Sequence, residues 1–248
     1  TDSEVFGFSQ VNSEHCRHKI FNGQFIIDGK EQKDSLFQHI KKTSKTNPNS
    51  IVSAYKDNVA FIGGPEIEQF APQKGDQPST YKKSLTESVI SLKAETHNFP
   101  TGVCPFPGAS TGTGGRIRDT IAIGKGGNII SGYVGYSVGN INPTKFNNYE
   151  YPYENPTNIL IKASDGASDY GNKIGEPVIL GYTRSFSMEK NDKRIEYVKP
   201  IMYCGGIGSI LKHNINKDIP SLGLLVVRVG GPAYCIGLGG GAASSRNQ

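Results

Sequence analysis

The sequence predicts a folded protein built from both helices and strands, and three observations support this. Hydrophobic residues make up 35% of the 248 residues and charged residues 20%, a balance that excludes strong disorder. The stretch Val89–Glu95 alternates with the period of two that is typical of a strand. Farther along the chain, Ile159, Ala163 and Ala167 recur at a four-residue spacing, which indicates a helix.

The first half of the chain contains patterns typical of two helices, a hairpin and one central strand. We expect a short apolar helix within residues 4–21, a helix capped by Asp34 or Ser35 whose Leu36, Phe37 and Ile40 share one face, two strands over 51–55 and 59–63, a polar loop over 65–83, and a strand over 89–95. Because side chains alternate along a strand, Lys93 and Glu95 share one face, and His97 joins them if the backbone stays extended.

The second half begins with a predicted glycine turn and continues with alternating strands and a helix. We expect a tight turn at 124–127, a strand over 129–138, a helix over 157–170 with Thr157 as N-cap, strands over 178–184 and 195–202 around the Asn191-Asp192 turn, and a buried strand over 224–229. Residues 140–156 are rich in Asn, Pro and Tyr and show little periodicity. They give the expected domain boundary, with domains at 1–150 and 151–248.

Charge and cysteine usage narrow the class of protein. The net charge of +5 comes from 27 basic and 22 acidic residues without a basic block, so we expect no nucleic-acid partner. No apolar run reaches the length of a membrane span, and we expect no membrane partner. The four cysteines show no C-x-x-C spacing, which favours reduced thiols in the cytoplasm over a disulfide framework.

The stretch from Lys93 to Asp119 concentrates the residue types of a nucleotide and metal site. Its glycine-rich segment, Gly108–Gly115, is predicted to be a loop whose backbone N–H groups approach phosphate oxygens closely. Glu95 and Asp119 could hold Mg²⁺ on the same phosphates. Two simpler interpretations stay open, namely a surface loop that requires positive φ angles and a solvated strand face.

Neither of the common phosphate signatures fits this segment. In a P-loop the last glycine is followed directly by lysine. Here Gly114 is followed by Gly115 and then Arg116, so the lysine is missing. The one formal dinucleotide fingerprint, Gly237-x-Gly239-x-x-Ala242, has no βαβ unit after it. The prediction therefore depends on the convergence of charged groups around the glycines.

A second polar group, His15-Cys16-Arg17-His18, lies near the N-terminus. Adjacent side chains on one element point in different directions, so a metal site built from them is disfavoured. A histidine that contacts phosphate or takes part in catalysis is the preferred interpretation, and a polar helix face is the alternative.

Four ordered motifs resemble the phosphoribosylformylglycinamidine synthase family, and the resemblance extends over essentially the whole chain. The motifs are Asn12-Ser13-Glu14-His15-Cys16-Arg17-His18-Lys19, Lys93-x-Glu95-Thr96-His97-Asn98-x-Pro100-Thr101, Pro107-Gly108-Ala109-x-Thr111-Gly112-x-Gly114-Gly115-x-Ile117-Arg118-Asp119 and Gly237-Leu238-Gly239-Gly240-Gly241-Ala242-Ala243-Ser244-Ser245. Residues 165–172 and Gly175-Glu176-Pro177 resemble the large, single-chain form.

This resemblance implies an α+β fold like that of aminoimidazole ribonucleotide synthetase. Its N-terminal domain has a mixed sheet packed by helices and forms a barrel with a partner copy. An α/β sandwich domain follows it. We expect residues 1–150 to form the first domain, with a leading helical segment, and residues 151–248 to form an incomplete second one.

The implied activity is that of an ATP-dependent carbon–nitrogen ligase of purine biosynthesis. ATP phosphorylates the amide oxygen of formylglycinamide ribonucleotide, and ammonia from a glutaminase domain then displaces phosphate to give the amidine. The residues carried over by resemblance are His15 and His97 as catalytic groups, His18, Lys93, Gly108, Gly112, Gly114, Gly115 and Arg118 at ATP, Thr96, His97, Asn98 and Arg118 at the substrate, and Glu95 and Asp119 at Mg²⁺.

The resemblance also implies partners and leaves alternatives open. A second synthetase half or a homodimer partner is expected, and the segment alone is expected to be inactive. Phe99 stands where many relatives have histidine, so a proton-transfer role at that position is lost. A non-catalytic nucleotide-binding module for assembly is the alternative function. Other members of the ATP-binding superfamily are disfavoured by Ser13-Glu14-His15-Cys16.

Overall fold

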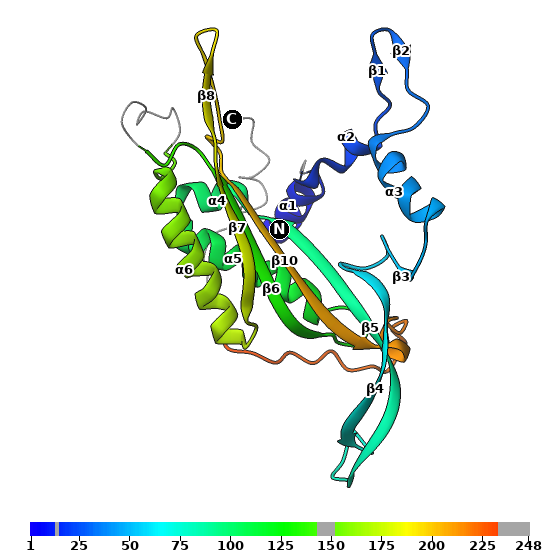
Figure 1. Cartoon of the computed structure of the whole chain (residues 1–248). Coiled ribbons are helices and arrows are strands. Elements are labelled where there is room, and N and C mark those ends of the chain that lie inside the picture. Colours follow the sequence, from blue (N-terminus) through cyan, green and yellow to red (C-terminus); the bar gives the residue numbers. More distant parts are fainter. Residues whose placement is uncertain (13–14, 143–151, 233–248) are drawn as a thin grey trace. The chain divides into compact units, whose positions relative to one another are not determined.

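The computed structural model describes residues 1–12, 15–142 and 152–232, and the chain forms two compact units. One unit comprises residues 1–49 together with the segment from Leu222 onward, and the other comprises Ser50–Ser221. Figure 1 shows the elements of both. Among the described residues, no helix is both long and apolar enough to cross a membrane.

The first unit contains short helices and one small hairpin. Its elements are α1 (Asp2–Val11), the 3₁₀ helix η1 (His15–Arg17), α2 (His18–Asn22), β1 (Ile26–Ile27), β2 (Lys30–Glu31) and α3 (Leu36–Thr46). The predicted α3 is confirmed, and a capping box begins it: the Gln38 backbone N–H donates to the Ser35 hydroxyl (3.2 Å), and the Ser35 N–H donates to the Gln38 side chain (2.6 Å).

The expected buried strand over 224–229 is wrong. Leu224, Leu225, Val226 and Val227 are all exposed, with Val226 at 102%. No described strand pairs with this segment. An apolar run forms a buried strand only where neighbouring strands satisfy its backbone groups and cover its side chains.

The second unit is built on a six-stranded sheet with the order β3-β4-β5-β10-β6-β7. The strands are β3 (Ile51–Ser53), β4 (Ala60–Pro72), β5 (Tyr81–Thr96), β6 (Asn128–Val138), β7 (Val178–Ser185) and β10 (Ile201–Leu211). All neighbours are antiparallel except β6 and β7, which are parallel. The sheet is therefore mixed, as the resemblance implies.

Helices α5 and α6 contact one face of this sheet (Figure 1). The remaining elements are α4 (Asn98–Val103), α5 (Pro105–Ile121), α6 (Pro156–Ile174), the hairpin strands β8 (Ser187–Lys190) and β9 (Lys193–Glu196), and the 3₁₀ helix η2 (Lys212–Asn214). The core lies beneath the helices in two buried clusters, one around Val134, Tyr136 and Met202, the other around Phe61 and Val89. Helix α6 is confirmed, but Asn155 caps it and Thr157 does not.

The sheet is continuous across the expected boundary at residue 150. β6 precedes that position, whereas its two neighbours, β7 and β10, follow it. Backbone hydrogen bonding between these strands places residues from both sides of the boundary in one unit. The contacts divide the chain instead near residues 50 and 221.

Two expected loops are regular structure. Residues 65–83, predicted to be a polar loop, mostly belong to β4 and β5, which stay paired from Ala60 with Leu92 to Pro72 with Tyr81. Most side chains of these paired strands are exposed, so their sequence does not need the alternation of apolar and polar residues that identifies a strand. The glycine-rich segment 108–115 forms the middle of α5, which overturns the predicted loop.

Close packing explains the glycines of α5. A Cβ at Gly112 would lie 2.7 Å from the Cβ of His97, and one at Gly114 would lie 2.6 Å from the Tyr170 ring. Glycine in a helix interior costs about 1 kcal/mol relative to alanine. The short approach of α5 to its neighbours offsets that cost, so these residues serve packing within the fold.

Candidate nucleotide and metal site

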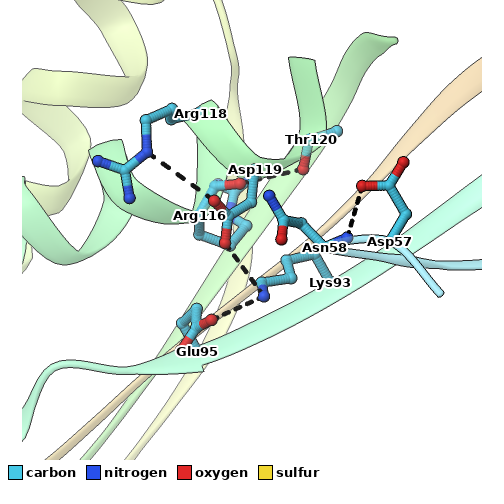
Figure 2. A network of polar contacts seen from close by, with 8 residues as sticks. All are labelled: Asp57, Asn58, Lys93, Glu95, Arg116, Arg118, Asp119 and Thr120. Atoms are coloured by element: carbon cyan, nitrogen blue, oxygen red, sulfur yellow. Dashed lines mark hydrogen bonds and ion pairs between the residues drawn. The ribbon is translucent and has the colours of Figure 1, made fainter. Parts of the chain in front are cut away.

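Lys93, Glu95 and Asp119 form one cluster between β5 and α5, as the sequence predicts. The alternation of β5 brings Lys93 and Glu95 to the face that α5 covers, and Asp119 comes from the last turn of α5. The Lys93 ammonium lies 2.7 Å from Glu95 Oε1 and 3.1 Å from Asp119 Oδ2. Figure 2 shows the ammonium between the two carboxylates. Two separate elements therefore meet in one polar site.

The electrostatics of the cluster favour a charged lysine. Burial by itself would lower the pKa of Lys93, but the hydrogen bonds and charges of Glu95 and Asp119 outweigh burial and hold the pKa above 10.5. Two carboxylates face the one ammonium directly, and the largely exposed Arg118 balances the remaining charge from the edge of the cluster.

The side chains of Asp119 and Glu95 differ in access to solvent. Asp119 is 17% exposed, whereas Glu95 is 43% exposed. Arg118 is 75% exposed, and its Nε lies 3.8 Å from Asp119 Oδ1. The guanidinium thus remains accessible to an anion at the edge of the cluster.

His97 and its neighbours mark the end of β5. His97 is the N-cap residue of α4, and its backbone N–H donates to the Met202 carbonyl at 2.9 Å. Its Nδ1 is buried near the Gly108 backbone and makes no hydrogen bond of normal geometry among the described residues. Burial lowers the pKa of His97 below 6.5, and the Glu95 charge opposes only part of that shift. The imidazole is therefore neutral at neutral pH.

The two neighbours of His97 have different surroundings. Asn98 Oδ1 accepts a hydrogen bond from the Met202 N–H (3.1 Å), which ties the residue to β10. Thr96 is exposed, and the parity of β5 places it on the face opposite Lys93 and Glu95. Phe99 packs edge-on against Tyr153, with 6.0 Å between ring centroids.

The predicted phosphate cradle is only partly accessible. Gly108, Gly112 and Gly114 are buried against protein, since a Cβ on Gly108 would lie 2.5 Å from the Pro100 carbonyl. At Gly115 the nearest such atom is a terminal nitrogen of Arg118 at 3.8 Å. Only Gly115 leaves open space beside its Cα.

His15 and His18 belong to the first unit and are described within it. The backbone there is unusual because Cys16 and Arg17 have φ angles of 61° and 50°. Positive φ at two consecutive non-glycine residues costs free energy and is concentrated at functional sites. The His18 ring packs edge-on against Phe37, with centroids 5.3 Å apart. Ser13, Glu14, the His15 side chain and the motif 237–245 lie outside the described part.

The donor set favours one kind of metal site. No group of three or more His, Cys, Asp or Glu side chains forms a metal cluster within the described ranges. Glu95 and Asp119 offer two carboxylates at one point, and Mg²⁺ is commonly held by one or two carboxylates together with substrate phosphates. The pair fits magnesium bound with a nucleotide better than a metal held by protein alone.

The sequence did not single out two other charged groups of this unit. Arg116 of α5 and Glu176, which follows α6, form a fully buried ion pair. Asp57 Oδ2 accepts hydrogen bonds from the Gly124 N–H (3.2 Å) and from Lys217 (2.8 Å). Burial alone would raise the pKa of Asp57, but these bonds hold it below 3.8. Both groups link distant segments, so no local signal could have revealed them.

Comparison with known proteins gives matches along nearly the whole chain. The formylglycinamide ribonucleotide amidotransferase linker domain matches residues 1–19. A phosphoribosylformylglycinamidine synthase of Dictyostelium discoideum is 48% identical and covers 99% of this chain, and one of Homo sapiens is 46% identical and covers 98%. The chain spans 19% of each relative. Among solved structures, a T. maritima PurL complexed with ADP aligns over 86% of this chain and 25% of its own, at 19% identity and a TM-score of 0.45. Over 98–99% of its length the chain is similar to one segment of the phosphoribosylformylglycinamidine synthases.

Proposed function

We propose that this segment supplies a nucleotide and metal site of an ATP-dependent ligase that converts formylglycinamide ribonucleotide to formylglycinamidine ribonucleotide in purine biosynthesis. The observation that carries the proposal is the Lys93–Glu95–Asp119 cluster. The cluster occurs in a chain that is 46–48% identical to two phosphoribosylformylglycinamidine synthases. The cluster has the cation and the two carboxylates that phosphoryl chemistry requires.

Magnesium fits the two carboxylates. Glu95 and Asp119 would hold it, and their nearness to the Lys93 ammonium supports a shared contact with phosphate oxygens. When bound, Mg²⁺ neutralises charge on the transferring phosphate. Without metal, Glu95 and Asp119 outweigh burial and raise the pKa of Lys93, and its ammonium would add a second positive charge near the phosphate.

The other residues of this unit have separate roles in the proposal. His97 is neutral and partly buried, so its imidazole can accept a proton near the amide. Arg118 is exposed enough to bind an anionic group of the ribonucleotide. Asn98 and Thr96 would help to hold the substrate. Backbone approach to phosphate is proposed only beside Gly115, where space is open.

The first unit would add His15 as a second catalytic group and His18 as a contact to ATP. Two consecutive positive φ angles between these histidines support a functional constraint on the motif. The match to the amidotransferase linker domain over residues 1–19 ends just after this motif.

Three partners are part of the proposal: formylglycinamide ribonucleotide, a second synthetase half or homodimer copy, and a glutaminase that supplies ammonia. The face of the sheet opposite α5 and α6 supports the second. Leu92, Leu180 and Tyr182 on β5 and β7 are 37%, 69% and 40% exposed. An apolar sheet face of this kind is typical of a surface that another subunit or domain covers.

The proposal is tested in the intact protein by Glu95→Gln and Asp119→Asn, with Glu68→Gln as the matched control. Glu68 also pairs with a lysine, at 2.8 Å from Lys83, but lies on the distal part of the β4–β5 hairpin. We expect each site variant to lose about 10²-fold or more in ammonia-dependent amidine formation, and the control to keep wild-type rates. Wild-type rates in both site variants would overturn the proposal. Nucleotide binding without turnover in the wild-type protein would favour the assembly module.

A further inference from the structure

Arg116 and Glu176 are two fully buried charges of the second unit. Both side chains are 0% exposed, and the guanidinium makes two parallel hydrogen bonds to the carboxylate. Sixty positions separate the two residues, which lie in α5 and just after α6. The fork geometry fixes distance and orientation together.

A slot in the sheet receives this pair. A Cβ at Gly206 of β10 would lie 2.4 Å from a terminal nitrogen of Arg116. One at Gly132 of β6 would lie 2.4 Å from Glu176 Oε1 and 2.6 Å from the other terminal nitrogen. Any side chain at either position would displace the pair, so the absence of a Cβ on two neighbouring strands forms the slot.

The slot lies in the same cross-strand row as Lys93. Gly206 pairs with Gly132 on one side and with Lys93 on the other. Residues directly opposite each other in antiparallel strands project to the same face. The guanidinium of Arg116 and the ammonium of Lys93 thus occupy neighbouring places on the covered face.

The helix connects the two places. Arg116 and Asp119 are three residues apart, a spacing that puts both on one face of α5. Figure 2 shows both side chains on the same stretch of the helix. When Arg116 is held in the slot, the rotation of α5 about its axis and its position along that axis are fixed. Asp119 Oδ2 then lies 3.1 Å from Lys93 Nζ.

We propose that the Arg116–Glu176 pair is a positioning element that sets helix α5 so that Asp119 contacts Lys93. This inference depends on the proposed function only for the identity of the ligand that the Lys93–Glu95–Asp119 cluster binds. Arg116 and Glu176 touch no part of the cluster in this account, and they act through the position of the helix.

The test replaces both charges at once in the intact protein. Replacement of a buried ion pair by apolar residues of similar size is often neutral for stability, so Arg116→Met with Glu176→Met removes the fork without leaving a lone charge. Glu176→Asp is the second variant, because it keeps the charge and shortens the side chain. Val138→Ala is the control, since it lowers stability at a buried position of β6.

The readout is the rate at which an amine-acylating reagent labels Lys93 without nucleotide, followed by peptide mass spectrometry. Glu95 and Asp119 hold the Lys93 ammonium at 2.7 and 3.1 Å, so the labelling rate reports whether Asp119 still contacts the amine. We expect labelling about three- to tenfold faster in the double variant, less in Glu176→Asp, and unchanged in Val138→Ala. Wild-type labelling in both folded pair variants overturns the proposal, as does equal acceleration in the control. If the double variant does not fold, Glu176→Asp decides.

A second measurement separates this inference from the proposed function. Binding of a non-hydrolysable ATP analogue with Mg²⁺ is titrated for the same variants. We expect about tenfold weaker binding in the pair variants. If the wild-type protein binds no nucleotide while labelling changes as expected, the proposed function fails and the positioning role stands. Equal nucleotide affinity in all variants, together with unchanged labelling, removes the positioning role alone.

Discussion

Arg116 and Asp119 lie three residues apart on helix α5 and belong to two different ion-pair groups. The two groups differ in burial and in the number of partners that each charge has. Arg116 and Glu176 are fully buried and matched one to one. In the Lys93–Glu95–Asp119 cluster two carboxylates share one ammonium, and Glu95 is 43% exposed. A buried pair with every charge matched has no capacity for a ligand. A partly open cluster has that capacity, so we assign the first group to the fold and propose the second as the binding site.

The largest effect should come from breaking the buried pair on one side. Glu176→Gln leaves the Arg116 charge buried without a counter-ion, which typically costs about 3–5 kcal/mol. Urea denaturation of the intact protein measures this loss. A change below about 1 kcal/mol would mean that water or another group compensates Arg116, and the contrast between the two groups would disappear.

Gly112→Ala is expected to be next in size. The new methyl group would lie 2.7 Å from the Cβ of His97, a rigid contact at the junction of α4 and α5. Overpacking of this kind costs about 1–3 kcal/mol. Gly115→Ala is the matched control because its Cβ meets only open space, and helix propensity predicts a gain of up to about 1 kcal/mol. Equal losses at both positions would contradict the packing explanation of the glycines.

His97 gives a pH dependence that the buried ion pair does not share. Because its folded pKa is lowered, the unfolded chain takes up a proton at higher pH than the folded chain. The stability from a neutral His97 is complete above pH 6.5 and is lost as the pH falls below that value, by at most about 1.4 kcal/mol per pH unit. Denaturation at pH 7.5 and pH 5.5 should show a smaller difference for His97→Gln than for the wild-type protein. An identical difference would show that folding does not lower the pKa of His97.

The smallest effect is expected for the stability of Glu95→Gln. A partly exposed ion pair contributes about 0–1 kcal/mol, so the melting temperature should change little even though activity falls. Differential scanning calorimetry checks this. A loss as large as that of Glu176→Gln would place Glu95 with the structural charges.

Local sequence patterns predicted the open cluster but could not predict the buried pair. The alternation of β5 predicted that Lys93 and Glu95 share a face, whereas the contact of Asp119 with Lys93 depends on how α5 packs on β5. Arg116 and Glu176 meet only because β6, β10 and two helices fold around them, across 60 positions of sequence. The motif Gly175-Glu176-Pro177 contains Glu176, but no local pattern indicates that Arg116 is its partner.

For the glycines of α5, the local sequence pattern gave a wrong prediction. Their density favoured a loop, yet tertiary packing makes them part of a helix, where close approach to His97 and Tyr170 outweighs poor helix propensity. The turn between β1 and β2 could have been predicted, because an Asp-Gly pair is a strong hairpin signal. Asp28 and Gly29 both have the positive φ angles that such a turn requires. That hairpin did not appear among the expected elements.

The central claim is that Glu95 and Asp119 hold magnesium with a nucleotide. The most direct test is a calorimetric titration of the intact protein with a non-hydrolysable ATP analogue, with and without Mg²⁺, for the wild type and for Glu95→Gln with Asp119→Asn. We expect Mg²⁺ to strengthen binding in the wild-type protein and to have no effect in the double variant. An equal effect of Mg²⁺ in both proteins would contradict metal binding by these two carboxylates.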